Sequence, residues 1–331
     1  LAHDRPLTQD AITAAFDVVM RGDASQVQIA ALLTGLRVRG ESADVVAGAA
    51  SALRRAMVRL DLPQHDGIVD TCGTGGGAVG TFNISTAAAL VAAGAGVRIA
   101  KHGNRSFTSK SGSADVLEAL GVSIDVDADA MRRAYDSAGI LFMFAPRMHP
   151  AMRHVGPVRG ELGIPTVMNI IGPLANPASV GRQVIGVADA ARVTVIADAL
   201  AARGTVHSLV VHGAPGMDEI SPLGPTRILE IRGAVITEWE CDPESIGADV
   251  ARPSELIGGT PAENAELIRS CLAGTAPAGA IAAVVANAGA AVYVAGMVDS
   301  LAAGVKRARA AIADGSATAA LERLRKALPR V

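Results

Sequence analysis

A cluster of glycines between a predicted strand and a predicted helix constrains this chain more than any other feature. Residues 67–71, GIVDT, predict a short strand, and the loop CGTGGGAVGT follows it directly. A helix is predicted over 83–96, with polar residues at its start and glycine at its end. Glycines allow backbone N–H groups to turn inward at a helix N-terminus, where the helix dipole favours anions. The pattern therefore predicts a cradle for a phosphate or diphosphate.

Two other phosphate-binding patterns fit this loop less well. A Walker A loop needs a lysine after its last glycine, and no lysine follows here. The dinucleotide spacing G-x-G-x-x-G does occur at Gly75, Gly77 and Gly80. The next strand, however, ends in Ala100-Lys101, where a dinucleotide site has an acidic residue for the ribose hydroxyls. A purely structural turn is the remaining alternative, although so many glycines are costly for a turn alone.

A second polar loop follows the next predicted strand. The strand is predicted at 97–100, and the loop KHGNRSFTSKSGS at 101–113 offers cations, amides and hydroxyls. Because ligands of open α/β sheets bind at the carboxyl ends of strands, two such loops on successive strand–helix units predict a shared anion site. A solvated surface loop is the alternative explanation.

The order of predicted elements indicates the fold class. Residues 7–60 show apolar positions at helical spacing and no alternating strand pattern. Strands then alternate with helices, and further strands are predicted at 140–144, 183–188, 205–211 and 226–231. Helices return over 261–327. This order predicts an α/β protein with a small all-helical domain and a larger α/β domain, whose mostly parallel central sheet is covered by helices.

The domain boundary is predicted where the helical spacing of apolar residues gives way to alternating strands and helices. Residues 1–66 are assigned to the helical domain and 67–331 to the α/β domain. The segment 148–182 interrupts the strand–helix rhythm with a predicted helix over 148–163 and a stretch rich in Pro and Gly. We expect part of this segment to pack against the N-terminal helices, which makes the helical domain discontinuous.

Composition excludes several functional classes. The formal charge is −2, from 30 Lys and Arg against 32 Asp and Glu, and no basic run favours a nucleic-acid partner. The three cysteines, Cys72, Cys241 and Cys271, form no CxxC pair and predict reduced thiols in a cytoplasm. The first residues carry no apolar signal segment. We therefore expect a cytoplasmic protein.

One uncharged stretch needs a separate explanation. Residues 271–298 contain no charged side chain, but they are mostly Ala and Gly and include Asn287. Because Ala and Gly give little transfer free energy into lipid, a helix buried inside the protein is predicted here in place of a membrane span.

Seven segments, in this order, resemble the motifs of anthranilate phosphoribosyltransferases. They are DTCGTGGG (70–77), TFNISTAAAL (81–90), KHGNRS (101–106), SGSADVLEALG (111–121), PVRGELG (157–163), NIIGPLANP (169–177) and VVHGAPGMDEIS (210–221). The resemblance implies Mg²⁺-dependent transfer of the phosphoribosyl group of phosphoribosyl diphosphate to the amine of anthranilate, the second step of tryptophan synthesis from chorismate. It also implies a homodimer formed through the helical domain.

The resemblance implies a role for individual residues at matching motif positions. The diphosphate would be held by Gly73, Thr74, Gly75, Gly76, Gly77, Thr81, Asn83, Ser85 and Thr86. The sugar-phosphate end would be held by Lys101, His102, Gly103, Asn104, Arg105, Ser106, Ser109 and Ser113. Mg²⁺ would be bound by Ser85, Asp218 and Glu219. Hard oxygen ligands of this kind suit Mg²⁺.

Anthranilate would contact Gly73, Asn104 and Arg159 in this family pattern. A guanidinium is well suited to the carboxylate of this substrate. No residue is assigned as a general acid or base, because an aryl amine is already neutral and nucleophilic near neutral pH. Each assignment has a plain structural alternative: a lone arginine on a helix is more often a surface charge, and adjacent acids are often a solvated turn.

The sequence departs from the family pattern at two positions. Gly77 stands where the family's glycine loop usually has Asp, and Pro165 stands where relatives often have Arg. The first departure removes a carboxylate beside the diphosphate, so we expect weaker binding of one Mg²⁺ while the backbone cradle is retained. The alternatives that remain are an enzyme like pyrimidine nucleoside phosphorylase and a non-catalytic phosphosugar-binding protein.

Overall fold

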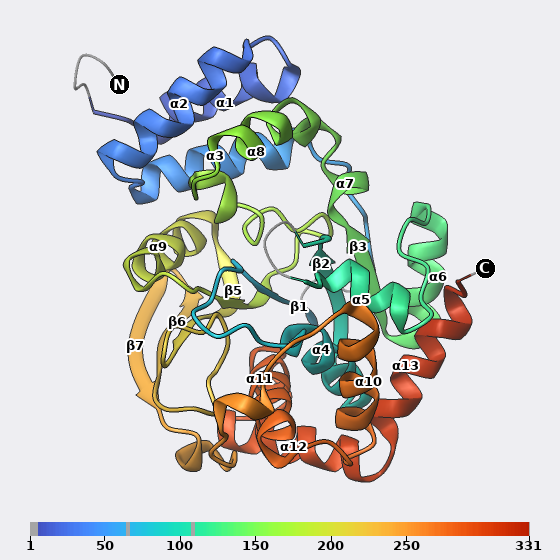
Figure 1. Cartoon of the computed structure of the whole chain (residues 1–331). Coiled ribbons are helices and arrows are strands. Elements are labelled where there is room, and N and C mark those ends of the chain that lie inside the picture. Colours follow the sequence, from blue (N-terminus) through green and yellow to red (C-terminus); the bar gives the residue numbers. More distant parts are fainter. Residues whose placement is uncertain (1–5, 64–66, 107–109, 331) are drawn as a thin grey trace.

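The computed structural model describes residues 6–63, 67–106 and 110–330. A group of N-terminal helices lies at one end of the molecule, and a helix-covered sheet forms the rest (Figure 1). This arrangement confirms the predicted combination of a helical part and an α/β part.

The helical part begins with three capped helices. They are α1 (Gln9–Arg21), α2 (Gln26–Arg39) and α3 (Ala43–Ala56). The hydroxyls of Thr8, Ser25 and Ser42 each accept a backbone N–H at a helix start, which satisfies donors that a helix leaves unpaired. In Figure 1, α8 (Gly156–Leu162) lies beside these helices, and Val155 and Val158 belong to the same buried cluster as Phe16.

The segment predicted as one helix over 148–163 is divided in the structure. A 3-10 helix covers Pro150–His154, and α8 begins separately at Gly156. Pro150 and Pro157 each lie in the first turn of a helix, where proline needs no N–H partner. Within a continuous helix, Pro157 would remove a backbone hydrogen bond, so the prediction of a single helix was wrong.

The central sheet has seven strands in the order β3-β2-β1-β4-β5-β6-β7. Their bounds are β1 Ile68–Gly73, β2 Arg98–Gly103, β3 Ile140–Phe144, β4 Arg182–Gly186, β5 Thr205–Gly213, β6 Thr226–Gly233 and β7 Val235–Cys241. Strands β1 to β5 pair in parallel, and β6 and β7 continue the sheet antiparallel. The mostly parallel sheet is as predicted, whereas β7 was not predicted.

Helices cover both faces of the sheet. Those that follow the N-terminal group are α4 (Ile84–Gly94), α5 (Ser113–Ala119), α6 (Ala128–Ala138), α7 (Ala145–Met148), α9 (Val193–Arg203), α10 (Pro261–Leu272), α11 (Ala278–Val294), α12 (Leu301–Ala313) and α13 (Ser316–Ala327). Short 3-10 helices cover Val167–Asn169, Ala190–Arg192, Glu244–Ile246 and Pro253–Glu255. One face packs on α4 and α11, and the other packs on α9 and the helical part.

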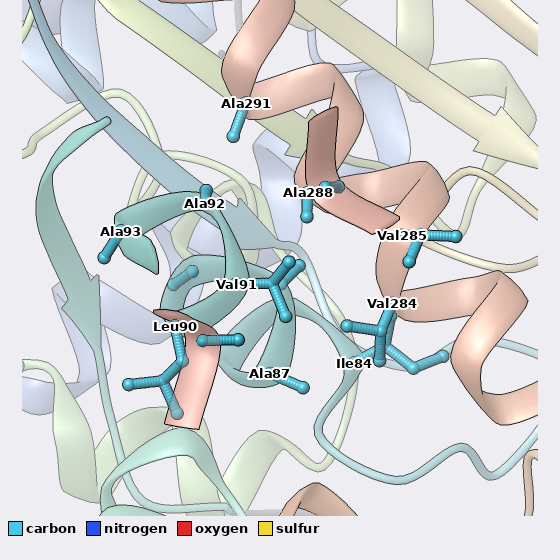
Figure 2. Packing of buried hydrophobic residues seen from close by; sticks show 14 of the residues in the cluster. Ile84, Ala87, Leu90, Val91, Ala92, Ala93, Val284, Val285, Ala288 and Ala291 are labelled. Carbon is cyan, nitrogen blue, oxygen red and sulfur yellow. The ribbon is translucent and has the colours of Figure 1, made fainter. Parts of the chain in front are cut away.

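The glycine-loop helix α4 is anchored by α11, the helix in the uncharged stretch. Both helices are buried on nearly all sides, as predicted for α11. Figure 2 shows Val91 of α4 with Val284 and Ala288 of α11 between the two helices. Small side chains allow this close packing, which fixes α4 and therefore the position of its N-terminus. Within the described ranges, no helix combines the length and the apolar character that crossing a bilayer requires.

Candidate active site

Four of the parallel strands end in glycine at the same edge of the sheet. These glycines are Gly73, Gly103, Gly186 and Gly213. A Cβ on Gly186 would lie 1.5 Å from the backbone oxygen of Asp218, and a Cβ on Gly73 would lie 2.3 Å from its Oδ2. The chain around Asp218 therefore crosses directly over the ends of β1 and β4. The strand order reverses between these two strands, and such a switch point is where α/β sheets bind ligands.

The glycine loop is held in shape from both sides. Gly75 and Gly76 have φ of 70° and 79°, in the left-handed region that favours glycine. The Gly75 N–H donates to Asp218 Oδ2 at 2.7 Å. The Thr74 N–H donates to Gly186 O at 2.9 Å, and Thr74 Oγ1 accepts from Ala188 N at 3.2 Å. The Thr74 hydroxyl is thus part of the loop's own scaffold.

Asp218 and Glu219 form an acidic pair against this loop. Burial raises the pKa of the Asp218 carboxyl, and the hydrogen bond from Gly75 partly offsets this. Burial and the adjacent Asp218 charge raise the pKa of Glu219 well above its usual range. Glu219 Oε2 is buried and has no hydrogen-bond partner among the described residues. Two neighbouring carboxylates with an unpartnered oxygen form a pair that a cation would stabilise.

The acidic pair fits a Mg²⁺ ion that shares its coordination with a substrate. In the part of the chain that the structure describes, no three His, Cys, Asp or Glu side chains are arranged so that they could hold a metal ion by themselves. The chain therefore offers two carboxylates, and Mg²⁺ commonly takes one or two carboxylates together with water and phosphate oxygens.

Lys101 lies under the start of α4. Its strand β2 runs to Gly103, three residues beyond the predicted end, because Lys101 and His102 pair with Phe142 and Met143 of β3. Lys101 is therefore a buried strand residue and not the first residue of an exposed loop. Its amine donates to Thr71 O, and to Ser85 Oγ at 3.3 Å.

A buried carboxylate supports the charge of Lys101. Burial lowers the pKa of Lys101, while Asp70 and Glu219 act in the opposite direction. The Asp70 carboxylate accepts from Asn176 Nδ2 at 2.7 Å and from the His102 N–H at 3.1 Å. Lys101 thus brings a partly compensated positive charge to the base of the glycine loop.

Asn83 connects three parts of the site. Its Nδ2 donates to Ser111 O at 3.0 Å, and its Oδ1 accepts from Ser111 Oγ at 3.2 Å. The same Oδ1 accepts from Asn264 Nδ2 at 2.9 Å, and Asn264 Oδ1 accepts from the Gly259 N–H at 2.7 Å. Asn83 therefore ties the glycine-loop helix to the second loop and to α10. Sequence reasoning missed Asn264, a buried amide whose only signal is its place inside a helix.

The second loop is stabilised by α5. Asn104 O accepts from Ser113 Oγ at 3.2 Å, and Asn104 Oδ1 accepts from the Arg105 N–H at 2.8 Å. The Arg105 guanidinium pairs with Asp115 at 2.8 Å and Glu118 at 2.7 Å, and these two acids raise its pKa.

The structure places two of the remaining predicted residues of this loop, and a third lies outside the described ranges. Ser106 donates its N–H to Asp115 Oδ2 at 3.1 Å. A Cβ on Gly103 would lie 2.2 Å from Ser113 Oγ, so glycine is required for the loop to close on its strand. The predicted Ser109 lies outside the described residues.

Thr86 and Arg159 are two further predicted residues whose side chains have no partner among the described residues. Thr86 is buried, and its Oγ1 makes no hydrogen bond within the described structure. Arg159, on α8, makes no ion pair or hydrogen bond through its side chain with any described residue. Burial lowers the pKa of its guanidinium. The Arg159 guanidinium therefore keeps donors that a ligand can use, whereas the Thr86 hydroxyl is a buried group that remains unsatisfied.

Two histidines that sequence reasoning left without a catalytic role lie together. The rings of His102 and His149 are 4.9 Å apart. His102 Nε2 and both ring nitrogens of His149 are buried without a hydrogen-bond partner among the described residues. Burial lowers the pKa of His102 well below its usual range, and it lowers the pKa of His149 to about 4. Both rings are neutral at neutral pH.

The His149 ring gives a prediction for stability against pH. The pKa of His149 is about 4 in the folded chain and about 6.5 in the unfolded chain. The neutral buried ring therefore costs no free energy of unfolding above pH ~6.5, and the protein loses free energy of unfolding as the pH falls from there toward 4. In His149→Gln, the loss of unfolding free energy between pH ~7.5 and ~5 should be smaller than in the parent chain by about 2 kcal/mol. Denaturant unfolding at both pH values measures this, and equal losses in the two proteins would contradict it.

Comparison with known proteins shows which family the chain belongs to. Residues 1–57 match the helical bundle domain of a glycosyl transferase family, and residues 65–318 match its a/b domain. The chain is 50% identical over 322 residues to an anthranilate phosphoribosyltransferase of Rubrobacter xylanophilus, covering 97% of this chain and 94% of the relative. It is 49% identical to the Thermomicrobium roseum protein of the same name, covering 94% and 90%.

Solved structures agree with the sequence relatives. Anthranilate phosphoribosyltransferase from Thermus thermophilus superposes with a TM-score of 0.92 at 41% identity, covering 98% of this chain and 96% of that one. The enzyme from Saccharomyces cerevisiae, in complex with PRPP and Mg, superposes with a TM-score of 0.88 at 29% identity, covering 97% and 93%.

Proposed function

We infer that this chain, which belongs to the anthranilate phosphoribosyltransferase family, transfers the 5-phosphoribosyl group of phosphoribosyl diphosphate to the amine of anthranilate. The products are N-(5-phosphoribosyl)anthranilate and diphosphate, and the reaction is the second step of tryptophan biosynthesis from chorismate. The observation that carries this function is the acidic pair Asp218–Glu219 lying against the glycine loop at the switch point of the sheet. Such an enzyme is a pentosyltransferase, and we place it in the cytoplasm.

The diphosphate is proposed to lie in the glycine loop at the N-terminus of α4. Backbone N–H groups of Gly76 and Gly77 and the hydroxyls of Thr81, Ser85 and Thr86 are the donors there. The N–H groups of Thr74 and Gly75 shape the loop, because they donate to Gly186 O and Asp218 Oδ2. The free Oγ1 of Thr86 and the Lys101 amine beside Ser85 support this placement. Asn83 has a positioning role in this proposal, since Ser111 and Asn264 occupy its side-chain oxygen.

Mg²⁺ is proposed to be held by Asp218, Glu219 and Ser85. Their oxygen atoms suit this ion, and the unpartnered Glu219 Oε2 supports the assignment. When bound, the ion neutralises charge on the diphosphate as it leaves.

The chemistry requires positioning more than proton transfer. The amine nitrogen forms a bond to C1 of the ribose as the bond from C1 to the diphosphate oxygen breaks, with inversion at C1 through an oxocarbenium-like state. The nitrogen, which is then positively charged, releases one proton to the departing diphosphate or to water. The amine is neutral and nucleophilic, so no strong general base is required to start the reaction. The chain's part is to align the two substrates and to stabilise the departing negative charge with N–H donors and Lys101.

Anthranilate is proposed to lie against the second loop, with its carboxylate on Arg159. The Asn104 side chain and the Gly73 backbone complete this assignment. Arg159 comes from α8, beside the N-terminal helices, while Gly73 and Asn104 come from the sheet edge. We propose that residues 1–66 with part of 148–182 move as one unit toward the rest of 67–331 and exclude water. A radius of gyration that does not change when both substrates bind would contradict this closure.

The two alternative functions are not favoured. A nucleoside phosphorylase uses free phosphate and has no need of an acidic metal pair, and the relatives named above share their identity over nearly the whole chain. A binding protein without catalysis would show substrate binding but no turnover.

A homodimer through the helical part is proposed from the surface of α2. Val27 is 79% exposed and Val38 is 83% exposed, and Ala31 lies exposed between them. These positions fall on one face of the helix and form an apolar stripe that a second copy would bury. A monomer mass in analytical ultracentrifugation would contradict the dimer.

The reaction itself is tested by the fluorescence of anthranilate. The signal should fall with time only when phosphoribosyl diphosphate, Mg²⁺ and the protein are all present. A steady signal beside an active control enzyme would reject the function, and phosphorolysis of nucleosides would then be assayed.

Arg159 should govern the binding of one substrate. In Arg159→Ala, the KM for anthranilate should rise by about tenfold or more, because a charged hydrogen bond to the carboxylate is lost. The KM for phosphoribosyl diphosphate should change far less. The exposed Arg153, on the neighbouring 3-10 helix, provides a control as Arg153→Ala. Equal effects of Arg159→Ala on both substrates would remove its proposed role.

Gly77 should set the requirement for Mg²⁺. A Cβ on Gly77 would lie 3.3 Å from Asp218 Oδ1, so Gly77→Asp places a third carboxylate beside the acidic pair. The Mg²⁺ concentration for half-maximal activity should fall by about tenfold, the factor given by ~1.4 kcal/mol of added attraction. Gly77→Asn is the uncharged control of similar size. An unchanged metal profile in Gly77→Asp would reject this account of Gly77.

A further inference from the structure

A cavity of about 80 Å³ lies between the helical part and α9, away from the residues assigned above. Its lining includes Ser51 and Arg54 of α3, Leu174, and Arg203 at the end of α9. Figure 1 shows α9 directly below α3. A single water needs about 10–15 Å³ by this measure, so the cavity has room for several waters or a small anion.

Two guanidinium groups converge on one backbone oxygen in this lining. Arg54 Nη1 donates to Leu174 O at 3.4 Å, and Arg203 Nη1 donates to the same oxygen at 2.9 Å. Arg54 Nη2 also donates to Ser179 Oγ at 3.4 Å, and Arg203 Nη2 donates to Gln183 Oε1 at 2.9 Å. A guanidinium has five N–H donors, so each arginine keeps several for another acceptor.

Neither arginine has a carboxylate partner among the described residues. Burial lowers the pKa of both groups, and each is also lowered by a neighbouring arginine: Arg59 acts on Arg54, and Arg54 acts on Arg203. Asp70 and Cys72 act on Arg203 in the opposite direction. Asp70 is already bonded to Asn176 and the His102 N–H. The cavity wall therefore holds two like charges with little compensation, which is unfavourable without an anion.

We propose that this cavity binds a small oxyanion with at least two anionic oxygens, such as inorganic phosphate or a short dicarboxylate. Two such oxygens can accept charge-assisted hydrogen bonds from both guanidinium groups. The bound anion lies between α3 and α9 and so ties the helical part to the α/β part. Arg203 leads into the amino end of β5, whereas the glycine loop lies at the carboxyl ends of the strands, so the two anion sites are distinct.

Binding of inorganic phosphate should be measured by calorimetry with phosphoribosyl diphosphate and Mg²⁺ saturating the active site. Chloride at equal ionic strength corrects for general screening. Arg54→Met and Arg203→Met should each weaken phosphate binding by about tenfold or more, since each removes a charged donor. The matched control is Arg55→Met, on the same helix, because Arg55 pairs with Asp17 and does not line the cavity. Equal affinity in all variants, or equal loss in the control, would overturn the proposal.

A second variant keeps the test valid if an arginine substitution prevents folding. Ser51→Asp supplies a carboxylate from the cavity wall, so it should raise the melting temperature without phosphate and abolish the response to phosphate. A lower melting temperature with an unchanged phosphate response would overturn the proposal. Malonate in place of phosphate tests a short dicarboxylate as the ligand. Binding of either anion that Arg54→Met weakens identifies the ligand class, and binding of neither anion rejects the site.

Discussion

The close approach of Asp218 to the ends of β1 and β4 is the constraint on which the active site depends. It is possible only because Gly73 and Gly186 have no Cβ, since a Cβ on Gly186 would overlap the Asp218 backbone oxygen at 1.5 Å. This approach brings the acidic pair onto the glycine loop, where Asp218 accepts the Gly75 N–H. Any side chain at these two strand ends would move the acidic pair away from the glycine loop.

This packing also determines which charged groups lie buried together beside the glycine loop. Burial raises the pKa of both carboxyls of the acidic pair, the Asp218 charge raises the pKa of Glu219 further, and Lys101 lies buried at the base of the same loop. Such a site is poorly satisfied by its own side chains and is best satisfied by a substrate and a cation together. The same reasoning applies to Arg159, a half-buried guanidinium without a carboxylate partner among the described residues.

Local sequence patterns predicted the fold and the order of the motifs, but they could not predict contacts between distant residues. The glycine loop, its flanking strand and helix, and the parallel sheet followed from periodicity and turn chemistry. The extension of β2 to Gly103 depends on pairing with β3, which no local pattern shows. The link from Asn83 to Asn264 spans 181 residues, and the meeting of His102 with His149 likewise depends on the tertiary fold. The edge strand β7 was missed because its alternating charged residues carry little apolar signal.

Asn83 shows how one side chain can connect several elements around the glycine loop. Its amide oxygen accepts from both Ser111 and Asn264, so the glycine-loop helix, the second loop and α10 share one hydrogen-bonded centre. When catalysis rests on alignment and not on a strong base, an error in the spacing of the two loops reduces the rate as surely as loss of a ligand. The buried network around Asn83 fixes that spacing.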